Sequence, residues 1–334
     1  MTKLVYIDDS LPGITRRGAG KGFAYYDPHG KLISDRKERE RLNAIALPPA
    51  YTDAWFCPAP NGHILATGYD ARGRKQYRYN PEFRAMREGE KFDSCLAFGR
   101  LLPLVRSRVE EDMADRKLTR SKAVASVVRL LDLGAVRIGN EGYARRNGSF
   151  GATTLRRKHA EITGNTLRLR YRGKGGKDRE VTLSDGSLAR VVRRMQDLPG
   201  QRLFQYFDEQ GDLETVDSCD VNEYLRETMA EDFTAKSFRT WHASVVAFRC
   251  IVEAREDITI SELLDCVSDQ LGNTPAVARK SYIHPAVIEL VSRQGEFREG
   301  LRLPRATRWL TKMERGLVEL LEDSPSATEL LAAA

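Results

Sequence analysis

The chain has 334 residues, of which 41% are hydrophobic and 30% are charged, as in an ordinary globular protein with room for two domains. Its 54 Lys and Arg residues outnumber 47 Asp and Glu residues, and the net charge of +7 favours a polyanionic partner without establishing one. No apolar run approaches the ~18 residues of a membrane helix, and no signal-peptide core follows Met1. We therefore expect no membrane association and a cytoplasmic setting.

The cysteines argue for the same setting. They are odd in number and widely scattered, at Cys57, Cys95, Cys219, Cys250 and Cys266. No close Cys/His pair has the spacing of metal ligands, so we expect no metal site. In a reducing cytoplasm, most of these cysteines are expected to be buried free thiols.

Residues 1–88 read as a small β-rich domain. Gly22–Ile33 has the pattern of a hairpin around an Asp-Pro-His-Gly turn. The charged stretch Asp35–Leu42 predicts a short helix. Ala54–Cys57 and His63–Asp70 predict a further pair of strands, so the expected structure is a small antiparallel sheet with a helix or two.

Basic, amide and aromatic residues then interleave without helical periodicity between Asp70 and Tyr79. Such a mixture can contact phosphates and base edges together. The alternative is a solvated basic loop with one buried tyrosine. The candidate nucleic-acid contacts are Arg74, Lys75, Gln76, Tyr77 and Tyr79.

From about residue 92 the pattern becomes helical. Phe92–Val109 predicts one helix with Asp93-Ser94 as its N-cap, and the next runs from Thr119 to Gly134. Arg137 follows this glycine stop in a Gly/Asn context, where backbone geometry can aim a side chain. The alternative for Arg137 is a surface ion pair.

Residues 152–183 predict strands. A hairpin with a Gly-Asn turn spans Ala160–Tyr171, and a second turn, Gly173–Lys177, leads into Arg179–Leu183. Lys174 therefore sits at a glycine-rich hairpin tip, from which a long cationic side chain can reach into a cleft. The alternative is an exposed turn lysine.

Helical periodicity returns after this region. Ser237 is a plausible cap of one of these helices, which would place Arg239 in the first turn among free backbone N–H groups that attract phosphate. The tail Ser324–Ala334 looks frayed. The predicted helices are Leu188–Leu198, Val221–Met229, Ser237–Glu253 and Ile258–Leu271.

Asn273-Thr274-Pro275 starts a further helix, which we expect to carry Tyr282. A tyrosine is a weak nucleophile because its phenol titrates near ~10. It becomes effective where cationic donors hold and neutralise the electrophile. The alternative is a packed tyrosine, since the chain has 12 of them.

These pieces, in this order, resemble the small poxvirus-like type IB DNA topoisomerases of bacteria, over about Ile14 to Ile288. The stretches that carry the resemblance are Gly73–Tyr79, Leu133–Asn140, Gly173–Lys177, Lys236–Thr240, Leu271–Pro275 and Lys280–Tyr282.

The resemblance implies an α+β protein with a DNA-clamp domain at residues 1–88 and a mostly helical catalytic domain with a small antiparallel sheet at residues 89–334. It implies relaxation of supercoiled duplex DNA by a monomer, without ATP, metal or another cofactor. Tyr282 would form a 3′-phosphotyrosyl link, Arg137 and Arg239 would clamp the phosphate, and Lys174 would protonate the leaving 5′-oxygen. Gln76, Tyr77 and Tyr79 match an amino-terminal-domain stretch that contacts the duplex in that family.

One position departs from the commoner family pattern. Asn273 stands where many members have histidine, and its amide can donate a hydrogen bond to phosphate but cannot carry a proton. Two alternatives stay open. A tyrosine recombinase shares this chemistry, although such enzymes usually have histidine where this chain has Lys236 and a helical amino-terminal domain. A non-catalytic basic DNA-binding protein needs only the positive charge.

Overall fold

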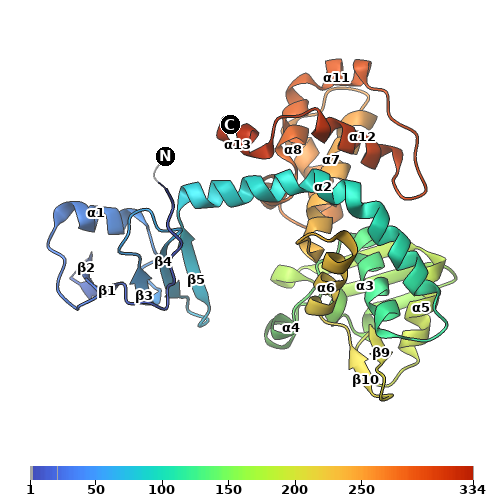
Figure 1. Ribbon diagram of the computed structural model, residues 1–334, viewed down its shortest axis with the longest axis horizontal. Coiled ribbons are helices and arrows are strands. Elements are labelled where there is room, and N and C mark those ends of the chain that lie inside the picture. Colours follow the sequence, from blue (N-terminus) through green and yellow to red (C-terminus); the bar gives the residue numbers. More distant parts are fainter. Residues whose placement is uncertain (1–2, 21, 334) are drawn as a thin grey trace. The chain divides into compact units, whose positions relative to one another are not determined.

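The computed structural model describes residues 3–20 and 22–333, and the chain divides into two compact units, residues 1–90 and 91–334 (Figure 1). The first unit is built on an antiparallel sheet, and the second is mostly helical with smaller sheets. The predicted α+β class is confirmed. In the described part of the chain, no helix combines the length and the apolar character needed to cross a membrane.

The sheet of the first unit has the order β2-β1-β3-β4-β5, with every neighbouring pair antiparallel. The predicted strand pair is β3 and β4, and the predicted helix is α1. Asp35 caps α1 by accepting a hydrogen bond from the Glu38 N–H at 2.7 Å. The elements are β1 (Ile14–Ala19), β2 (Gly22–Tyr26), α1 (Arg36–Ala44), β3 (Thr52–Phe56), β4 (Ile64–Tyr69) and β5 (Lys75–Tyr79).

The core of this unit is small. Leu42 of α1 packs with Tyr25 and Phe56 of the sheet, and all three side chains are buried. Burial of these side chains fixes α1 against the sheet. In the strand order, β5 is an edge strand.

Helix α2 (Pro81–Ala114) begins well before the predicted start at Phe92. Asp93 therefore lies inside α2 and cannot be its N-cap. Its carboxylate instead accepts hydrogen bonds from Ala327 N, at 2.5 Å, and Thr328 Oγ1, at 2.9 Å, at the start of α13 (Ala327–Ala333). The prediction of a frayed tail was wrong, because a partner distant in sequence caps this last helix and buries Ala327 and Leu330.

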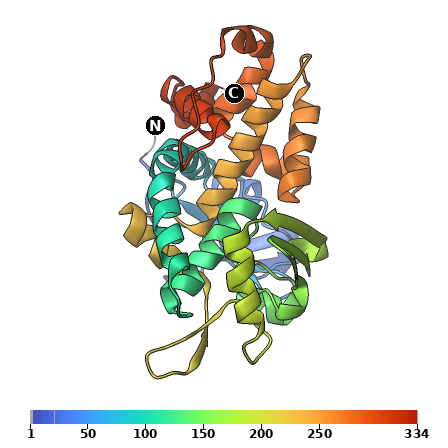
Figure 2. The same cartoon turned by 90° about the vertical axis from the view of Figure 1, so that its right-hand side faces the viewer.

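The second unit is built around α7. Figure 2 shows the strands β6 to β8 beside α3 and α5. Besides α13 and most of α2, its helices are α3 (Arg120–Gly134), α4 (Glu141–Asn147), α5 (Gly186–Gln196), α6 (Ser218–Met229), α7 (Ala235–Glu253), α8 (Ile260–Leu271), α9 (Pro275–Ser281), α10 (Pro285–Glu289), α11 (Gln294–Gly300) and α12 (Lys312–Glu322). Its strands are β6 (Ala160–Thr163), β7 (Thr166–Arg172), β8 (Asp178–Ser184), β9 (Gln205–Phe207) and β10 (Leu213–Thr215).

Helix α7 starts earlier than predicted. Thr234 occupies the cap position, and Ser237 lies in the first turn, where its hydroxyl oxygen accepts a hydrogen bond from Thr234 N at 3.4 Å. Trp241, one turn further on, is fully buried and packs against Gly99 of α2, where an added Cβ would lie 2.3 Å from the indole. Arg239 is therefore in the second turn and points into the protein, not in the first turn among free N–H groups.

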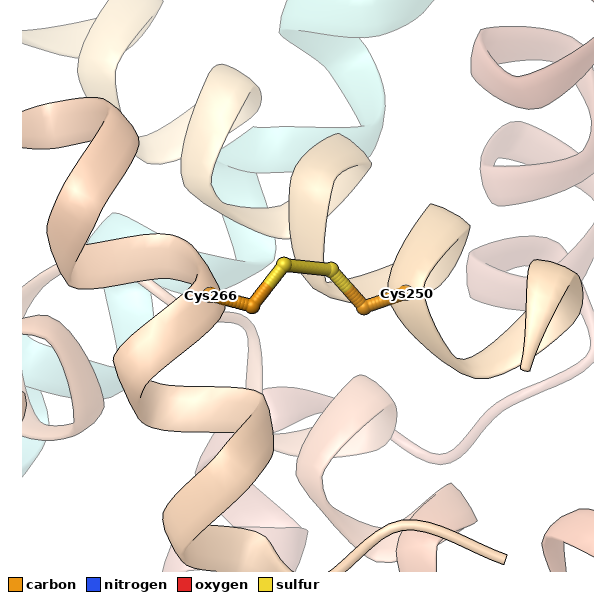
Figure 3. The surroundings of a disulfide bond; sticks show 2 residues. All are labelled: Cys250 and Cys266. Carbon is orange, nitrogen blue, oxygen red and sulfur yellow. A yellow bond between two sulfur atoms is a disulfide. The ribbon is translucent and has the colours of Figure 1, made fainter. Parts of the chain in front are cut away.

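The cysteines also depart from the prediction. Cys250 of α7 and Cys266 of α8 form a disulfide with a Cα–Cα distance of 7.2 Å (Figure 3). Cys57 and Cys95 are buried free thiols, as expected, whereas Cys219 is exposed. The pairing was missed because two cysteines 16 residues apart become neighbours only when α7 and α8 pack together.

Candidate active site

Arg239 is the most deeply buried of the predicted site residues, with 3% of its surface exposed. Its Nη1 donates to Ala135 O, and its Nη2 donates to Leu271 O at 3.1 Å and to Asn273 Oδ1 at 3.0 Å. Burial, followed by repulsion from Arg137, lowers the pKa of Arg239 to about 10. No carboxylate among the described residues forms an ion pair with it, so this buried cation can accept an anionic ligand.

Arg137 is held by the backbone that follows α3. Ala135 adopts the left-handed conformation (φ 47°) at the end of that helix. The next segment is then tied down, because Ala152 N donates to Arg137 O and Thr153 N donates to Ile138 O, each at 2.8 Å. Gly151 permits this close approach, since an added Cβ would lie 2.5 Å from Arg137 O. The Nη2 of Arg137 is thereby directed to Asn273 Oδ1.

Asn273 joins the two arginines. It follows Gly272, which ends α8 with φ 62°, and its Oδ1 accepts a hydrogen bond from each guanidinium. Two donors in this cluster are buried without a hydrogen-bond partner, Asn273 Nδ2 and Arg239 Nε. Unsatisfied buried donors are rare, and here they lie where an oxygen-rich ligand would satisfy them.

Tyr282 caps the end of α9 instead of lying inside that helix, because α9 ends at Ser281. Its backbone is fixed on both sides. Tyr282 N donates to Ala278 O at 3.0 Å, and Lys91 Nζ donates to the preceding Ser281 O at 3.0 Å. The expected helix thus holds Tyr282 at its C-cap, and the expected proximity to the arginines is found: the Arg239 guanidinium carbon lies 5.0 Å from the centroid of the phenol ring.

The charges around Tyr282 change its acidity. Burial alone would raise the pKa of the phenol. The positive charge of Arg239, with smaller contributions from Arg137 and Lys236, outweighs burial and lowers the pKa below its ordinary value. The site therefore makes the phenolate, which is the nucleophilic form, easier to reach than in a free tyrosine.

Lys174 lies at the tip between β7 and β8, in a turn where Gly175 and Gly176 have φ values of 77° and 76°. These positive values suit glycine, so the turn sequence places Lys174 at the tip. The side chain is exposed, and it lines a small cavity with Arg137 and Arg239. The volume of that cavity, about 10 Å³, is that of roughly one water. As it stands, this cavity is smaller than a phosphate group.

The structure thus brings together the predicted catalytic residues of the second unit. Arg137, Arg239, Asn273 and Tyr282 are in mutual contact or close proximity, and Lys174 lines one cavity with Arg137 and Arg239. Sequence reasoning missed one nearby cation, Arg179, and noted Lys236 only as part of a family motif, without a role at the site. Arg179 alternates with outward-facing residues along β8, and this alternation was the one sequence signal that its side chain faces inward. Among the described residues, no cluster of three or more His, Cys, Asp or Glu could hold a metal ion.

The predicted DNA-contacting stretch of the first unit is the turn that ends at Arg74 followed by the edge strand β5, which carries Lys75, Gln76, Tyr77 and Tyr79. Tyr77 and Tyr79 are both exposed, and their rings stack with centroids 5.8 Å apart. Arg74 pairs with Asp70, and Lys75 pairs with Asp9, each at 2.7 Å. Gln76 Nε2 also donates to Asp70, at 3.1 Å. The side-chain hydrogen bond from Arg74 lowers the pKa of Asp70 to about 2.

Comparison with known proteins decides the family. A family model described as eukaryotic DNA topoisomerase I, catalytic core, matches residues 80–287. A second, described as bacterial DNA topoisomerase IB, N-terminal domain, matches residues 22–70. The DNA topoisomerase 1B of Acanthamoeba polyphaga mimivirus is 31% identical over 301 residues, which are 86% of this chain and 90% of the viral protein. The chain belongs to the type IB DNA topoisomerases.

Other similarities are more distant. The DNA topoisomerase 1B of vaccinia virus (strain Copenhagen) is 18% identical over 281 residues, covering 81% of this topoisomerase and 88% of the viral one. The solved structure of the XerH site-specific recombinase bound to its difH substrate matches at a TM-score of 0.35 and 14% identity, covering 65% of this chain and 56% of that chain, and this likeness carries no weight here. The predicted family and enzyme class, a type I DNA topoisomerase, are confirmed.

Proposed function

We propose that this topoisomerase relaxes supercoiled duplex DNA through a covalent link between Tyr282 and the 3′-phosphate of a nicked strand. One observation carries the assignment: two arginines without a carboxylate partner among the described residues converge on Asn273 Oδ1 beside Tyr282. The carboxamide oxygen occupies an acceptor position that suits a non-bridging phosphate oxygen. When DNA enters, the two guanidinium groups exchange that oxygen for phosphate.

In the cleavage step, Tyr282 Oη attacks the scissile phosphorus and loses its proton to solvent. A bond forms between Oη and phosphorus, and the bond from phosphorus to the 5′-oxygen breaks. The ammonium of Lys174 gives a proton to this departing oxygen, because an alkoxide is a poor leaving group. Arg137 and Arg239 stabilise the charge that develops on the non-bridging oxygens, and Asn273 Nδ2, which has no partner in the structure, donates to one of them.

Resealing is the reverse reaction. The 5′-hydroxyl attacks the phosphotyrosine, the neutral amine of Lys174 takes its proton, and the phenolate of Tyr282 leaves. The lowered pKa of Tyr282 helps this step as well, since a more acidic phenol is a better leaving group. The energy of the phosphodiester is conserved in the ester, so the cycle needs no ATP and no metal. Strand rotation between the two steps relaxes the DNA.

The partner and setting follow from this reaction. We place a monomer on duplex DNA in the cytoplasm, with the basic and aromatic residues of β5 on the duplex. The exposed, stacked rings of Tyr77 and Tyr79 support the contact, as do the neighbouring cations Arg74 and Lys75. A sedimentation measurement with and without a duplex tests whether one copy binds.

Plasmid relaxation in EDTA without ATP tests the reaction, with Tyr282→Phe compared against the parent and against Tyr143→Phe. Tyr143 is 45% exposed on α4, and Tyr143→Phe is the matched control because it also removes one tyrosine hydroxyl. We expect the parent and Tyr143→Phe to yield a ladder of topoisomers, and Tyr282→Phe to bind DNA without nicking it. Covalent adducts at particular sites without relaxation would favour a recombinase. Covalent adducts formed by Tyr282→Phe would show that Tyr282 is not the nucleophile.

A further inference from the structure

Arg179 lies between the hairpin tip that carries Lys174 and the end of α8 that leads to Asn273. It is a half-buried residue of β8, directly opposite the buried Tyr171 in the pairing with β7. It lines the small cavity that Arg137, Lys174 and Arg239 also line. The proposed reaction gives this third arginine no task.

The stem of Arg179 supports the hairpin tip. An added Cβ on Gly173 would lie 2.9 Å from Arg179 Cγ, so the chain just before Lys174 rests on the arginine's methylene groups. The tip itself is closed by a hydrogen bond from Gly173 N to Lys177 O at 2.7 Å. The position of Lys174 thus depends on the contact between Gly173 and Arg179.

The other end of Arg179 is anchored on α8. Its Nη2 donates to Gln270 O at 3.2 Å, in the last turn of that helix. The guanidinium covers Gly272, where an added Cβ would lie 1.7 Å from Nη1. The residue after Gly272 is Asn273, which binds both Arg137 and Arg239. One side chain therefore connects the hairpin of Lys174 with the segment of Asn273.

We infer that Arg179 is a positioning residue, which holds the Lys174 hairpin against the end of α8 so that the ammonium stays in register with the two phosphate-binding arginines. This inference rests on the proposed role of Lys174 as the proton donor. Placement matters for proton transfer, since a misplacement of about 1 Å can cost about 10²-fold in rate. The turn contains three glycines and cannot fix the lysine on its own.

An apolar side chain at position 179 could not replace Arg179 fully in holding the hairpin. No carboxylate among the described residues forms an ion pair with Arg179, and its charge contributes, after burial and Arg137, to lowering the pKa of Arg239. A guanidinium can donate to a backbone carbonyl while its stem stays packed, and a hydrocarbon can supply only the packing.

Single-turnover cleavage of two duplexes tests the inference. One duplex has the ordinary phosphodiester, and the other has a bridging sulfur in place of the 5′-oxygen. A thiolate leaves without a proton, so the second duplex does not need the general acid. We expect Arg179→Ala to cleave the ordinary duplex about tenfold to hundredfold more slowly than the parent, and to cleave the sulfur duplex within about threefold of the parent rate.

Milder substitutions of Arg179 separate a loss of positioning from a loss of the folded structure. Arg179→Met keeps the stem and should fold, and it should show the same selective defect in a milder form. Arg179→Lys keeps one donor that can reach Gln270 O and should recover part of the rate on the ordinary duplex. Arg168→Ala removes one charge from the other face of the same hairpin, where Arg168 pairs with Glu180 at 2.5 Å, and should not discriminate between the duplexes.

Two other results would overturn the inference. Equal slowing on both duplexes by Arg179→Ala and Arg179→Met would place Arg179 in the phosphate clamp, and unchanged cleavage would leave it no role. Lys174→Ala, run in parallel, separates this failure from that of the proposed function. Rescue of Lys174→Ala but not of Arg179→Ala by the sulfur duplex refutes only the positioning role. Lack of rescue for Lys174→Ala refutes the proton donor, and the positioning role with it.

Discussion

Cations occur in two very different settings in this topoisomerase. At the start of β5 in the first unit, Arg74, just before the strand, and Lys75, its first residue, form ion pairs at 2.7 Å with Asp70 and Asp9, and the side chain of Arg74 is 46% exposed. In the site of the second unit, the 3%-exposed Arg239 and its neighbour Arg137 share a neutral amide oxygen instead of a carboxylate. One group of cations is already neutralised in the free protein, and the other is not.

The difference separates binding from chemistry. An exposed ion pair is worth about 0–1 kcal/mol, so it exchanges easily for a phosphate contact and does little to fix the geometry of its side chains. A buried cation without a counter-ion costs stability, and it persists where function requires it. We therefore expect substitutions on β5 to change affinity and its salt dependence, and substitutions in the site to change rate.

The largest effect is expected for Arg239→Ala. Removing one preorganised donor from a transition-state oxyanion typically costs about 10²–10³ in rate, so cleavage should slow by that factor while duplex affinity changes little. Single-turnover cleavage and equilibrium binding measure the two quantities. Arg249→Ala, on the same helix, is the control and should cleave like the parent. Equal losses in affinity and rate would mean that the site does not differ from β5.

Asn273→Asp tests the same contrast by giving the site a carboxylate like that of Asp70. A charged oxygen would pair with Arg137 and Arg239 in place of the amide oxygen and would compete with the phosphate. We expect cleavage to slow by about 10²-fold and thermal stability to rise. Asn273→Ala loses one hydrogen bond to a charged group, worth about 1.5–3 kcal/mol, and should slow cleavage by about tenfold to hundredfold. A faster Asn273→Asp than Asn273→Ala would contradict this account.

The sequence was informative where local patterns determine structure. The glycine-rich turn located Lys174 at a hairpin tip, the helix stop at Gly134 located Arg137, and alternation predicted β7 and β8. The ordered motifs named the five catalytic candidates, and the structure brings these side chains together. Their roles in the reaction remain predictions.

Features that depend on distant partners could not be read in this way. Asp93 caps a helix 234 residues later, and the bond between Cys250 and Cys266 depends on the packing of α7 against α8. For Arg179 the alternation of its strand indicates an inward-facing side chain but not its contacts, which lie at Gly173 and at the end of α8. The pairing of Lys75 with Asp9 was also unforeseen, because Asp9 lies on the amino-terminal segment, far from β5 in sequence.

The pH dependence of cleavage gives a smaller effect. Arg239, Arg137 and Lys236 lower the pKa of Tyr282, so the rate should rise with pH and reach its plateau below the ~10 of a free tyrosine. Lys236→Gln removes one cation, which raises this pKa and moves the rising limb to higher pH. Below the limb, the variant should be a few-fold slower than the parent, and at the plateau the rates should converge. An unshifted limb would show that Lys236 does not act on the phenol.

In the turn before β5, Asp70→Asn should remove the ion pair of Arg74 and the hydrogen bond of Gln76, which favours contact of both side chains with the duplex. The pKa of Asp70 is about 2, so the carboxylate is charged at every working pH and only substitution removes it. Loss of a surface ion pair worth about 0.2–1 kcal/mol should tighten DNA binding by up to about fivefold and steepen its salt dependence. Asp53→Asn, an exposed position on β3, makes the same change in net charge and should have less effect. A change in cleavage rate would place β5 in the chemistry.

The smallest effect on activity is expected for Cys250→Ser, which removes the bond between α7 and α8 without changing a site side chain. A cross-link over 16 residues restricts the unfolded chain and is worth about 3 kcal/mol of unfolding free energy. Cleavage should therefore match that of the parent, while denaturant unfolding shows the loss. A reductant should lower the stability of the parent by the same amount and leave Cys250→Ser unchanged. Because α7 carries Arg239 and α8 leads to Asn273, a fall in rate with either treatment would instead mean that this bond holds the two arginine contacts of Asn273 in place.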